Sequence, residues 1–420
     1  MQGGVGDYTS RLALALRKLG LEVAVLTSAK AKPVPDSVDV FDQVEASVDT
    51  WSFSCWRRLT DFLSRYSPDV LHIQYQTAGY SMHPAINLAP LLLKLAGQRP
   101  RVLVTFHDLR VPYLFPKAGA IRRLPGYLLA RCADGVVVTN SEDYSSLAKT
   151  TEHRGRPLRR RDDSLPSQAD SVVNGQGCPS LWSGRPLFAI PIGSNILKSP
   201  PAGYEREAWR RRLGVEQGEL LLVYFGFLNQ NKGVDVLLHA FADLLKTGFG
   251  ARLVMVGGSF GDSDPTNIAY GQRIRRQVES SEYSAKVIWT GFTSGEEVSA
   301  NLLASDVCVL PFNEGASLRH GTLIAAIVHE LPIITTTGPS QNVGHPAFPS
   351  LQRAVRLVPP RDAGALAGAI LELGQSKSRR EELSRSVAML APAFDWNVIG
   401  RAHVDAYDLV LSKRRLDHVS

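Results

Sequence analysis

The sequence predicts an α/β protein made of two doubly wound, Rossmann-like domains. Short β-branched runs alternate with stretches of helical periodicity, which is typical of βα units with buried parallel strands. This alternation occurs on both sides of the proline- and glycine-rich segment SPPAGYERE, which begins at Ser199. A length of 420 residues suits two domains. We therefore expect residues 1–198 and 199–395 to form two domains facing a cleft, the default ligand site.

The first domain is expected to contain five buried strands, beginning at Glu22, Asp69, Arg101, Gly135 and Leu187. The segment GGVG near the chain start normally follows a strand in such folds. No strand-like run precedes it here, so we expect either that this domain lacks its usual first strand or that the chain start is truncated. Residues 151–186 are polar, rich in arginine and without periodicity, which predicts an irregular insert.

The second domain repeats the pattern with six strands, beginning at Leu220, Ala251, Lys286, Val307, Pro332 and Val355. Helical segments lie between them, with apolar residues at spacings of three and four: Lys232 to Thr247, Gly295 to Ala304 and Asp362 to Leu373.

Composition excludes several classes of protein. The four cysteines are far apart and form no C-x-x-C, so neither a disulfide framework nor a zinc site is expected, and a reducing compartment fits. No apolar run is long enough to span a bilayer, and we expect a cytoplasmic protein. The formal charge of +7 favours anionic partners. We expect no nucleic-acid partner.

Two features of the first domain could carry chemistry. Gly3, Gly4 and Gly6 would let the backbone approach a ligand, and the helix that follows would point its first amides at an anion or hydroxyl. The alternative is a tight turn without a ligand. His107, followed by Asp108, stands at the end of the strand RVLVTF, where an α/β sheet delivers side chains to its carboxyl edge.

In the second domain, a cation and free amides would meet after the first strand. Gly226 ends that strand, and Lys232 and Gly233 open an amphipathic helix, an arrangement suited to a diphosphate. The alternative is a solvated lysine on a surface helix. The spacing does not match G-x-x-x-x-G-K-[ST], so a P-loop ATPase is not expected.

A second loop of this domain is expected to face the same ligand. It carries one carboxylate, one guanidinium and a helix start, which together could hold a sugar hydroxyl and a phosphate. The residues concerned are Glu314, Ser317, Arg319, His320, Gly321 and Thr322. By contrast, we interpret Asp262, Ser263 and Asp264 as a solvated turn and not as a metal-binding D-x-D, and no metal is expected.

Together these segments resemble the family 4 glycosyltransferases over nearly the whole chain. The resemblance is carried by GGVGDYT, VTFHD, PIGSN, FGFLNQNKGVDVLLHAF, VIWTGF, the acidic loop leading to ELPIITT, and FDWNVIGRAHVDAYDLV. It implies retaining enzymes of the two-domain GT-B architecture that use a nucleotide-sugar donor and a sugar, polysaccharide or lipid-linked acceptor, with no cofactor. It also implies that residues 396–420 form a helix crossing back onto the first domain.

Carried over position by position, the resemblance places Gly4 in the glycine loop near donor phosphate or acceptor. His107 would contact the donor sugar, Lys232 would neutralise the leaving diphosphate, and Glu314 would meet the transferred sugar. The acceptor hydroxyl would attack on the face from which the nucleotide leaves, so catalysis would rest on positioning and on stabilising the leaving charge.

The sequence departs from the family pattern at two positions. The usual G-R-L before the lysine reads Gly226-Phe227-Leu228, so the arginine expected beside the lysine is absent. The second glutamate of the usual pair falls on Ala325 when counted back from Pro332. We expect Arg319 to supply the missing positive charge.

A basic, aromatic stretch without acidic residues runs from Leu109 to Ala133 and includes Arg122 and Arg123. It could lie on anionic lipid and bring a lipid-linked acceptor to the first domain. The alternative is an ordinary solvated helix and loop.

Two other functions stay open at this point. A dinucleotide-dependent oxidoreductase would use GGVG, but no strand precedes these glycines, and no acidic residue follows the next strand at the required spacing. A catalytically silent GT-B binding protein would keep the fold while losing the arginine and the second glutamate.

Overall fold

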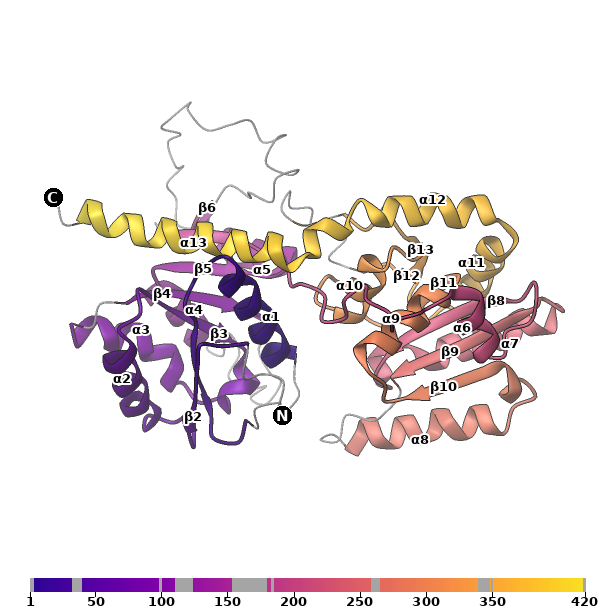
Figure 1. Cartoon of the computed structure of the whole chain (residues 1–420), viewed down its shortest axis with the longest axis horizontal. Coiled ribbons are helices and arrows are strands. Elements are labelled where there is room, and N and C mark those ends of the chain that lie inside the picture. Colours follow the sequence, from indigo (N-terminus) through magenta and orange to yellow (C-terminus); the bar gives the residue numbers. More distant parts are fainter. Residues whose placement is uncertain are drawn as a thin grey trace, which may run out of the picture. The chain divides into compact units, whose positions relative to one another are not determined.

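The computed structural model describes residues 4–31, 40–97, 100–109, 124–152, 180–182, 185–257, 265–338, 348 and 350–417. The chain forms two compact units, each built around its own sheet (Figure 1). The first unit contains the chain up to Gly193 and again from Asp395 onward. The second contains most of the chain from Ser194 to Phe394.

The main sheet of the first unit has five strands in the order β3-β4-β5-β7-β6. β3, β4, β5 and β7 are parallel, as the β-branched runs predict, and β6 is antiparallel to β7. Val104 and Val136 on one face and Leu103 and Val137 on the other are fully buried, which shows that both faces of the central strands are covered. The bounds are β3 Val70–Tyr75, β4 Arg101–Phe106, β5 Gly135–Val138, β6 Ser180–Trp182 and β7 Arg185–Ala189.

A separate pair of parallel strands, β1 (Ala24–Ser28) and β2 (Gln43–Val48), completes the first unit's strands. Among the described residues no strand precedes the first helix, α1 (Gly4–Lys18), and β1 and β3 each pair with one strand only. β2 is a strand that the sequence analysis does not predict. Its first two residues, Gln43 and Val44, are exposed, and polar Glu45 and Ser47 interrupt it, so it has no continuous apolar run to signal it.

Helices cover both faces of the main sheet. α1 and α13 (Trp396–Asp417) lie side by side on one face, where Leu12, Leu16, Ile399 and Val410 pack with Leu103, Val137 and Phe188 of the strands (Figure 1). Helices α2 (Cys55–Tyr66), α3 (Ala85–Leu95) and α4 (Leu124–Cys132) contribute to the opposite core with Ile73 and Val104. The remaining helices are the 3-10 turn η2 (Thr77–Tyr80) and α5 (Ser141–Glu152).

The second unit contains a six-stranded parallel sheet in the order β10-β9-β8-β11-β12-β13. Counted from β8, this is the order 3-2-1-4-5-6 of a doubly wound Rossmann fold, which confirms the predicted fold class for this half. The four inner strands are largely buried, and the edge strands β10 and β13 are mostly half-buried. All six begin within two residues of their predicted starts: β8 Leu220–Gly226, β9 Ala251–Gly257, β10 Val287–Gly291, β11 Val307–Leu310, β12 Ile333–Thr336 and β13 Arg356–Val358.

Helices on both sides of this sheet close its core. α7 carries buried Leu237, Leu238 and Phe241 at helical spacing and packs against α11. The helices are α6 Arg206–Arg212, α7 Val234–Lys246, α8 Pro265–Glu279, α9 Gly295–Ala304, α10 Gly321–Val328, α11 Ala363–Gln375 and α12 Lys377–Ala388, with 3-10 turns η4 Gln230–Lys232, η5 Ser284–Lys286 and η7 Ala391–Phe394.

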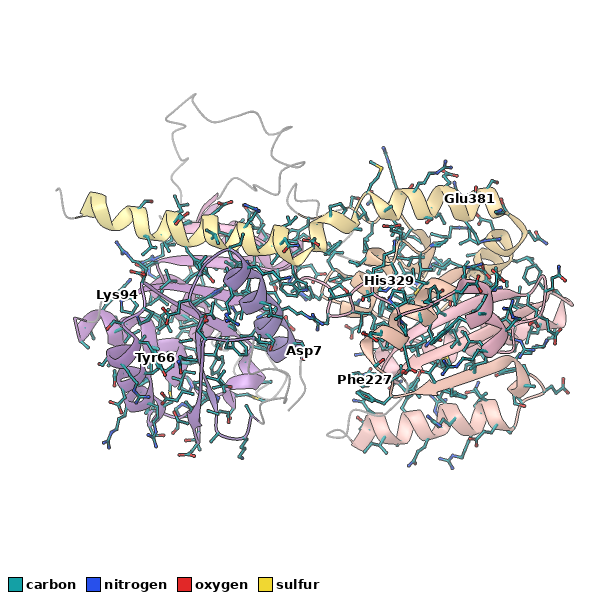
Figure 2. All side chains as sticks on the ribbon, in the orientation of Figure 1. Asp7, Tyr66, Lys94, Phe227, His329 and Glu381 are labelled. Atoms are coloured by element: carbon teal, nitrogen blue, oxygen red, sulfur yellow. The ribbon has the colours of Figure 1, made fainter. Side chains whose placement is uncertain are left out.

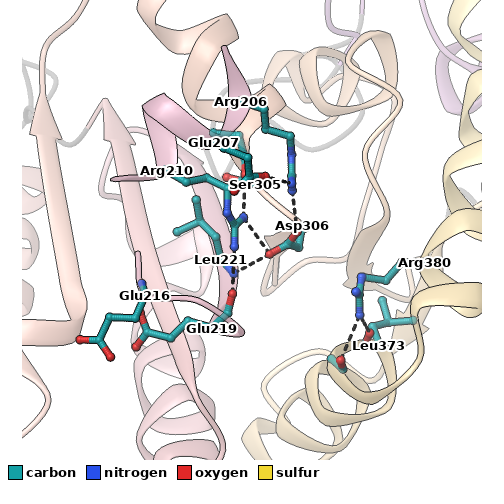
Figure 3. Close-up of polar contacts among 12 residues, drawn as sticks. Arg206, Glu207, Arg210, Glu216, Glu219, Leu221, Ser305, Asp306, Leu373 and Arg380 are labelled. Atoms are coloured by element: carbon teal, nitrogen blue, oxygen red, sulfur yellow. Dashed lines mark hydrogen bonds and ion pairs between the residues drawn. The ribbon is translucent and has the colours of Figure 1, made fainter. Parts of the chain in front are cut away.

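A buried network of charges fastens α6 to the sheet (Figure 3). The Arg210 guanidinium donates to the Asp306 carboxylate (3.0 Å) and to the Ala304 and Glu219 carbonyl oxygens (both 2.9 Å). Asp306 also accepts a hydrogen bond from the Leu221 amide (2.8 Å). Because each partner is hydrogen-bonded, removal of one would leave the other charge buried and uncompensated, so this network has a structural role. Arg210 thus contributes to the positive charge of the chain but binds groups of the protein itself.

The two described ends of the insert expected at 151–186 have regular secondary structure. α5 continues to Glu152, and β6 and β7 occupy its end as an antiparallel pair. Residues 153–179, and with them most of the insert, lie outside the described residues, as do Gly3, Arg122, Arg123 and Asp262 to Asp264. In the described part of the chain, no helix combines the length and apolar character needed to cross a membrane.

Candidate active site

The strand order of the second unit places two loops at one point of the sheet. β8 leads to β9 on one side, and β11 leads to β12 on the other, while β8 and β11 are neighbours. In open α/β sheets, ligands bind outside the carboxyl ends of the strands at such a switch point. The segments that follow β8 and β11 contain Lys232 and the loop from Phe312 to Thr322, so the predicted residues converge here.

Local hydrogen bonds fix the turn that carries Lys232. The Asn229 side chain accepts from the Asn231 amide (2.8 Å) and caps η4. Asn313, from the loop after β11, donates its backbone amide to the Asn231 carbonyl (2.9 Å) and its side-chain amide to the Gln230 carbonyl (2.6 Å). The two loops are thereby joined by backbone contacts beside Lys232.

Gly226 and Gly233 have backbone conformations that favour glycine. Gly233 has φ 67°, and a Cβ there would collide with the carbonyl oxygen of Pro311. Gly226 has φ 141°, and a Cβ there would lie 3.2 Å from Thr322 Cγ2. Both glycines are thus required for the close approach of the β8 segment to the loop after β11, which is a structural reason for their presence.

The Lys232 ammonium lies 4.7 Å from the centroid of the Phe312 ring. Burial lowers the pKa of Lys232 to about 8, because the charged form loses solvation. Within the described residues no carboxylate forms an ion pair with this ammonium, and the aromatic face is its neighbour instead. A half-buried cation without a carboxylate is suited to an anionic ligand.

The loop after β11 holds its side chains by short-range contacts. The His320 ring stacks on Phe312 with centroids 3.9 Å apart, and its Nδ1 accepts a hydrogen bond from the Ser317 amide (3.3 Å). Since Nδ1 accepts, a neutral His320 carries its proton on Nε2. The Ser317 hydroxyl accepts from the Arg319 amide (3.4 Å). Glu314 is exposed at the turn between Phe312 and Gly315.

Two buried oxygen atoms at this point have no hydrogen bond within the described residues: Asn313 Oδ1 and Thr322 Oγ1. Thr322 lies in the first turn of α10, directly after the exposed Gly321. Buried polar atoms are rarely left without a partner, so a bound ligand or water is the natural acceptor or donor for them. Asn313 was not among the predicted site residues, although its position beside Glu314, directly after a buried strand, is the signal that could have indicated it.

In the first unit, His107 follows β4, as predicted. Its Nε2 lies 2.9 Å from Gln74 Oε1, and its ring forms a T-shaped contact with the Tyr8 ring, with centroids 4.7 Å apart. Two effects lower the pKa of His107 to about 4: burial, which is the larger, and electrostatic repulsion from the nearby His403. The His107 ring is therefore neutral near pH 7. Gln74 and Tyr8 were not predicted, because neither β3 nor α1 shows a pattern that singles them out.

The glycines near the chain start are placed differently from the expectation. Gly4 and Gly6 lie inside the first turn of α1 and not in a loop before it, and a Cβ at either would meet nothing within 4 Å. No close backbone approach therefore explains them within the described residues. The free amides of a first helical turn stay available at this position.

The two departures from the family pattern are visible in the second unit. Phe227, which stands where the family has arginine, is 61% exposed (Figure 2). Ala325, the position of the second glutamate, is buried inside α10. The compensating role of Arg319 stays a prediction.

Two protein-family models match the chain. Residues 3–150 match the glycosyl transferase 4-like domain, and residues 219–376 match the glycosyl transferases group 1 model. Together they cover most of both units. The chain is a family 4-like glycosyltransferase.

Curated relatives of this glycosyltransferase agree with that assignment. The D-inositol 3-phosphate glycosyltransferase of Streptomyces griseus is 27% identical over 98% of this chain and 86% of its own length. The alpha-monoglucosyldiacylglycerol synthase of Streptococcus pneumoniae is 25% identical, over 36% of this chain and 33% of its own length.

Solved structures agree on the GT-B fold. Sucrose-phosphate synthase from Thermosynechococcus elongatus matches with a TM-score of 0.66 and 20% identity, over 100% of this chain and 94% of the other. Anabaena HepE in complex with UDP and glucose matches with a TM-score of 0.65 and 15% identity, over 97% of this chain and 96% of the other. These likenesses concern the fold.

Proposed function

We propose that the glycosyltransferase is a retaining enzyme that moves a sugar from a nucleotide-sugar donor to a hydroxyl acceptor in polysaccharide or glycolipid synthesis. The names of the relatives support this class of reaction, since they include an inositol phosphate glycosyltransferase and a glucosyldiacylglycerol synthase. HepE, of the same fold, was solved with UDP and glucose.

The observation that carries the proposal is the Lys232 ammonium, which is half-buried at the switch point and has no carboxylate partner within the described residues. The diphosphate of a nucleotide sugar would supply the missing negative charge. The amides at the start of α10 and the hydroxyl of Thr322 would add hydrogen bonds to its oxygens.

In this proposal the acceptor hydroxyl forms the new bond to the anomeric carbon as the bond to the diphosphate oxygen breaks. The nucleoside diphosphate leaves with the electron pair, and one of its phosphate oxygens takes the acceptor's proton. Lys232 stabilises the charge that develops on the leaving group. Glu314 and His107 would contact hydroxyl groups of the donor sugar, as the resemblance implies.

The proposal requires no metal, because Lys232 and the start of α10 provide positive charge for the leaving group. No group of three potential metal-binding side chains occurs among the residues that the structure describes. Membrane contact around Arg122 and Arg123 and a cytoplasmic location stay predictions.

A ligand screen tests the proposal. UDP-, GDP- and ADP-sugars are added to the full chain, with NAD as the comparison, and thermal unfolding and release of nucleoside diphosphate are measured. We expect one nucleotide sugar to raise the melting temperature and to be turned over, with a product that keeps the donor's anomeric configuration. Stabilisation by NAD alone would contradict the proposal. Binding of a nucleotide sugar without turnover or donor hydrolysis would instead indicate the silent binding protein.

A further inference from the structure

Three histidines meet inside the first unit. His72 lies on β3, His107 follows β4, and His403 lies on α13. Burial lowers the pKa of all three: to about 4 for His107 and His403, and well below the ordinary value for His72. Near pH 7 each ring is therefore neutral, and each has one protonated nitrogen and one lone pair. In each ring, the hydrogen-bond partner of one nitrogen determines whether the proton is on that nitrogen or on the other one.

The partner of His107 determines its tautomer. The His107 Nε2 lies 2.9 Å from Gln74 Oε1, and an amide oxygen can only accept. His107 Nε2 must therefore carry the proton and donate it. The lone pair is then on Nδ1, for which the described residues provide no hydrogen bond.

We propose that Gln74 is a positioning residue that holds His107 with its proton on Nε2, so that Nδ1 accepts a hydrogen bond from a hydroxyl group of the bound sugar. The nature of the ligand rests on the proposed function; the tautomer does not. A lone pair at Nδ1 attracts a hydroxyl hydrogen and repels a phosphate oxygen. His107 thus selects for the sugar and not for the diphosphate of the donor.

Gln74 is itself held in place. Its side-chain nitrogen lies 3.3 Å from Nε2 and 3.4 Å from Nδ1 of His72. His72 in turn is fixed between the Thr105 hydroxyl (2.7 Å) and the Tyr407 hydroxyl on α13 (2.8 Å). The amide nitrogen of Gln74 therefore faces His72, and its oxygen faces His107.

Tyr8, the second neighbour of His107, is also held in place by a residue of α13. His403 Nδ1 donates to the Ile399 carbonyl (2.8 Å), so its Nε2 accepts from the Tyr8 hydroxyl (3.2 Å). Tyr8 is buried, and its ring packs against the His107 ring at 80°. The last helix thus holds Tyr8 directly through His403, and it holds Gln74 indirectly, through the contact of Tyr407 with His72.

Nitrogen-15 spectroscopy of the full chain tests the tautomer without any substrate. With nitrogen-15 histidine, the two-bond proton correlations of the ring separate protonated from unprotonated nitrogens, and His107→Gln identifies the resonances. We expect the wild type to show a protonated Nε2. Gln74→Met, which lacks the acceptor, should show a mixture of tautomers, and Gln74→Glu, which keeps an acceptor, should restore the protonated Nε2. A wild-type ring protonated on Nδ1, or an unchanged tautomer in Gln74→Met, would overturn the proposal.

Kinetics test the hydroxyl contact. We expect Gln74→Met to lower kcat/KM about tenfold, the value of one hydrogen bond, while the affinity for free nucleoside diphosphate stays unchanged and Gln74→Glu recovers part of the loss. Equal weakening of nucleoside diphosphate binding would contradict the assignment to the sugar. If no nucleotide sugar is turned over at all, the proposed function fails, and the tautomer measurement still decides the role of Gln74.

Discussion

At the scale of single residues, the chemistry of the second unit depends on Lys232. Its ammonium is half-buried beside Phe312 and lacks a carboxylate partner among the described residues. An aromatic face compensates a cation only partly, so burial lowers the pKa of Lys232 to about 8. A dianionic ligand would restore the charged form, and donor binding and the protonation of Lys232 are therefore coupled.

This coupling predicts a pH dependence. A lowered pKa means that the ammonium is present below about pH 8 and lost above it. Because kcat/KM reports groups of the free enzyme, we expect it to fall as the pH rises through about 8. Lys232→Arg, whose guanidinium stays charged, should show less of this alkaline decline at a lower maximum. A wild-type kcat/KM that stays constant up to about pH 10, near the ordinary pKa of lysine, would contradict this role.

At the scale of elements, the site depends on the junction between η4 and α7. Gly233 joins them with φ 67°, and its amide donates to the Gln230 carbonyl (3.2 Å). The Pro311 carbonyl lies where a Cβ would stand. The loop that holds Asn313 and the turn that holds Lys232 can therefore touch only with glycine at this position.

A matched pair of glycines tests this junction. Gly248, after α7, also has a positive φ (80°), but a Cβ there meets nothing within 4 Å. We expect Gly248→Ala to cost only the backbone strain, about 1 kcal/mol, and Gly233→Ala to cost about 2–4 kcal/mol because a collision is added. Denaturant unfolding measures both. Donor affinity should fall in Gly233→Ala alone, and equal effects of the two substitutions would contradict the argument.

Strands with a continuous apolar run could be predicted from the sequence, because a strand that is buried on both faces is apolar at nearly every position. β8 and β9 are examples. β2 and β6 could not be predicted in this way: β2 is partly exposed, and β6 is a three-residue strand inside a polar segment. Their pairing depends on neighbours far away in the sequence, which local patterns do not reveal.

Site residues show the same limit. Lys232, Gly233 and His107 could be recognised because each lies shortly after a strand or just before a helix, where backbone geometry predicts exposure to a ligand. Gln74 and Tyr8 could not, because their contacts with His107 arise from tertiary packing between β3, α1 and the end of β4. Asn313 is an intermediate case, since its place after β11 was visible but its bonds to Gln230 and Asn231 were not.

At the scale of the whole molecule, each unit combines a structural core with one functional edge. In the second unit, the charges of Arg210 and Asp306 are paired with one another (Figure 3). The Lys232 ammonium at the switch point has no carboxylate partner in the described part of the chain. In the first unit, the last helix packs on α1 and holds the residues that orient His107. The candidate chemistry of the chain thus lies at the carboxyl ends of strands, whereas the charges around Arg210 are paired with one another.

The central claim is that Lys232 stabilises the diphosphate leaving group of a nucleotide-sugar donor. The direct measurement is the release of nucleoside diphosphate from the preferred donor by the wild type, Lys232→Ala and Lys246→Ala. Lys246 is the matched control, since it is an exposed lysine at the end of α7 that forms a surface ion pair with Asp243 (2.7 Å). We predict that Lys232→Ala lowers kcat on the order of 10²-fold and that Lys246→Ala leaves it unchanged. A Lys232→Ala variant as active as the wild type would contradict the claim.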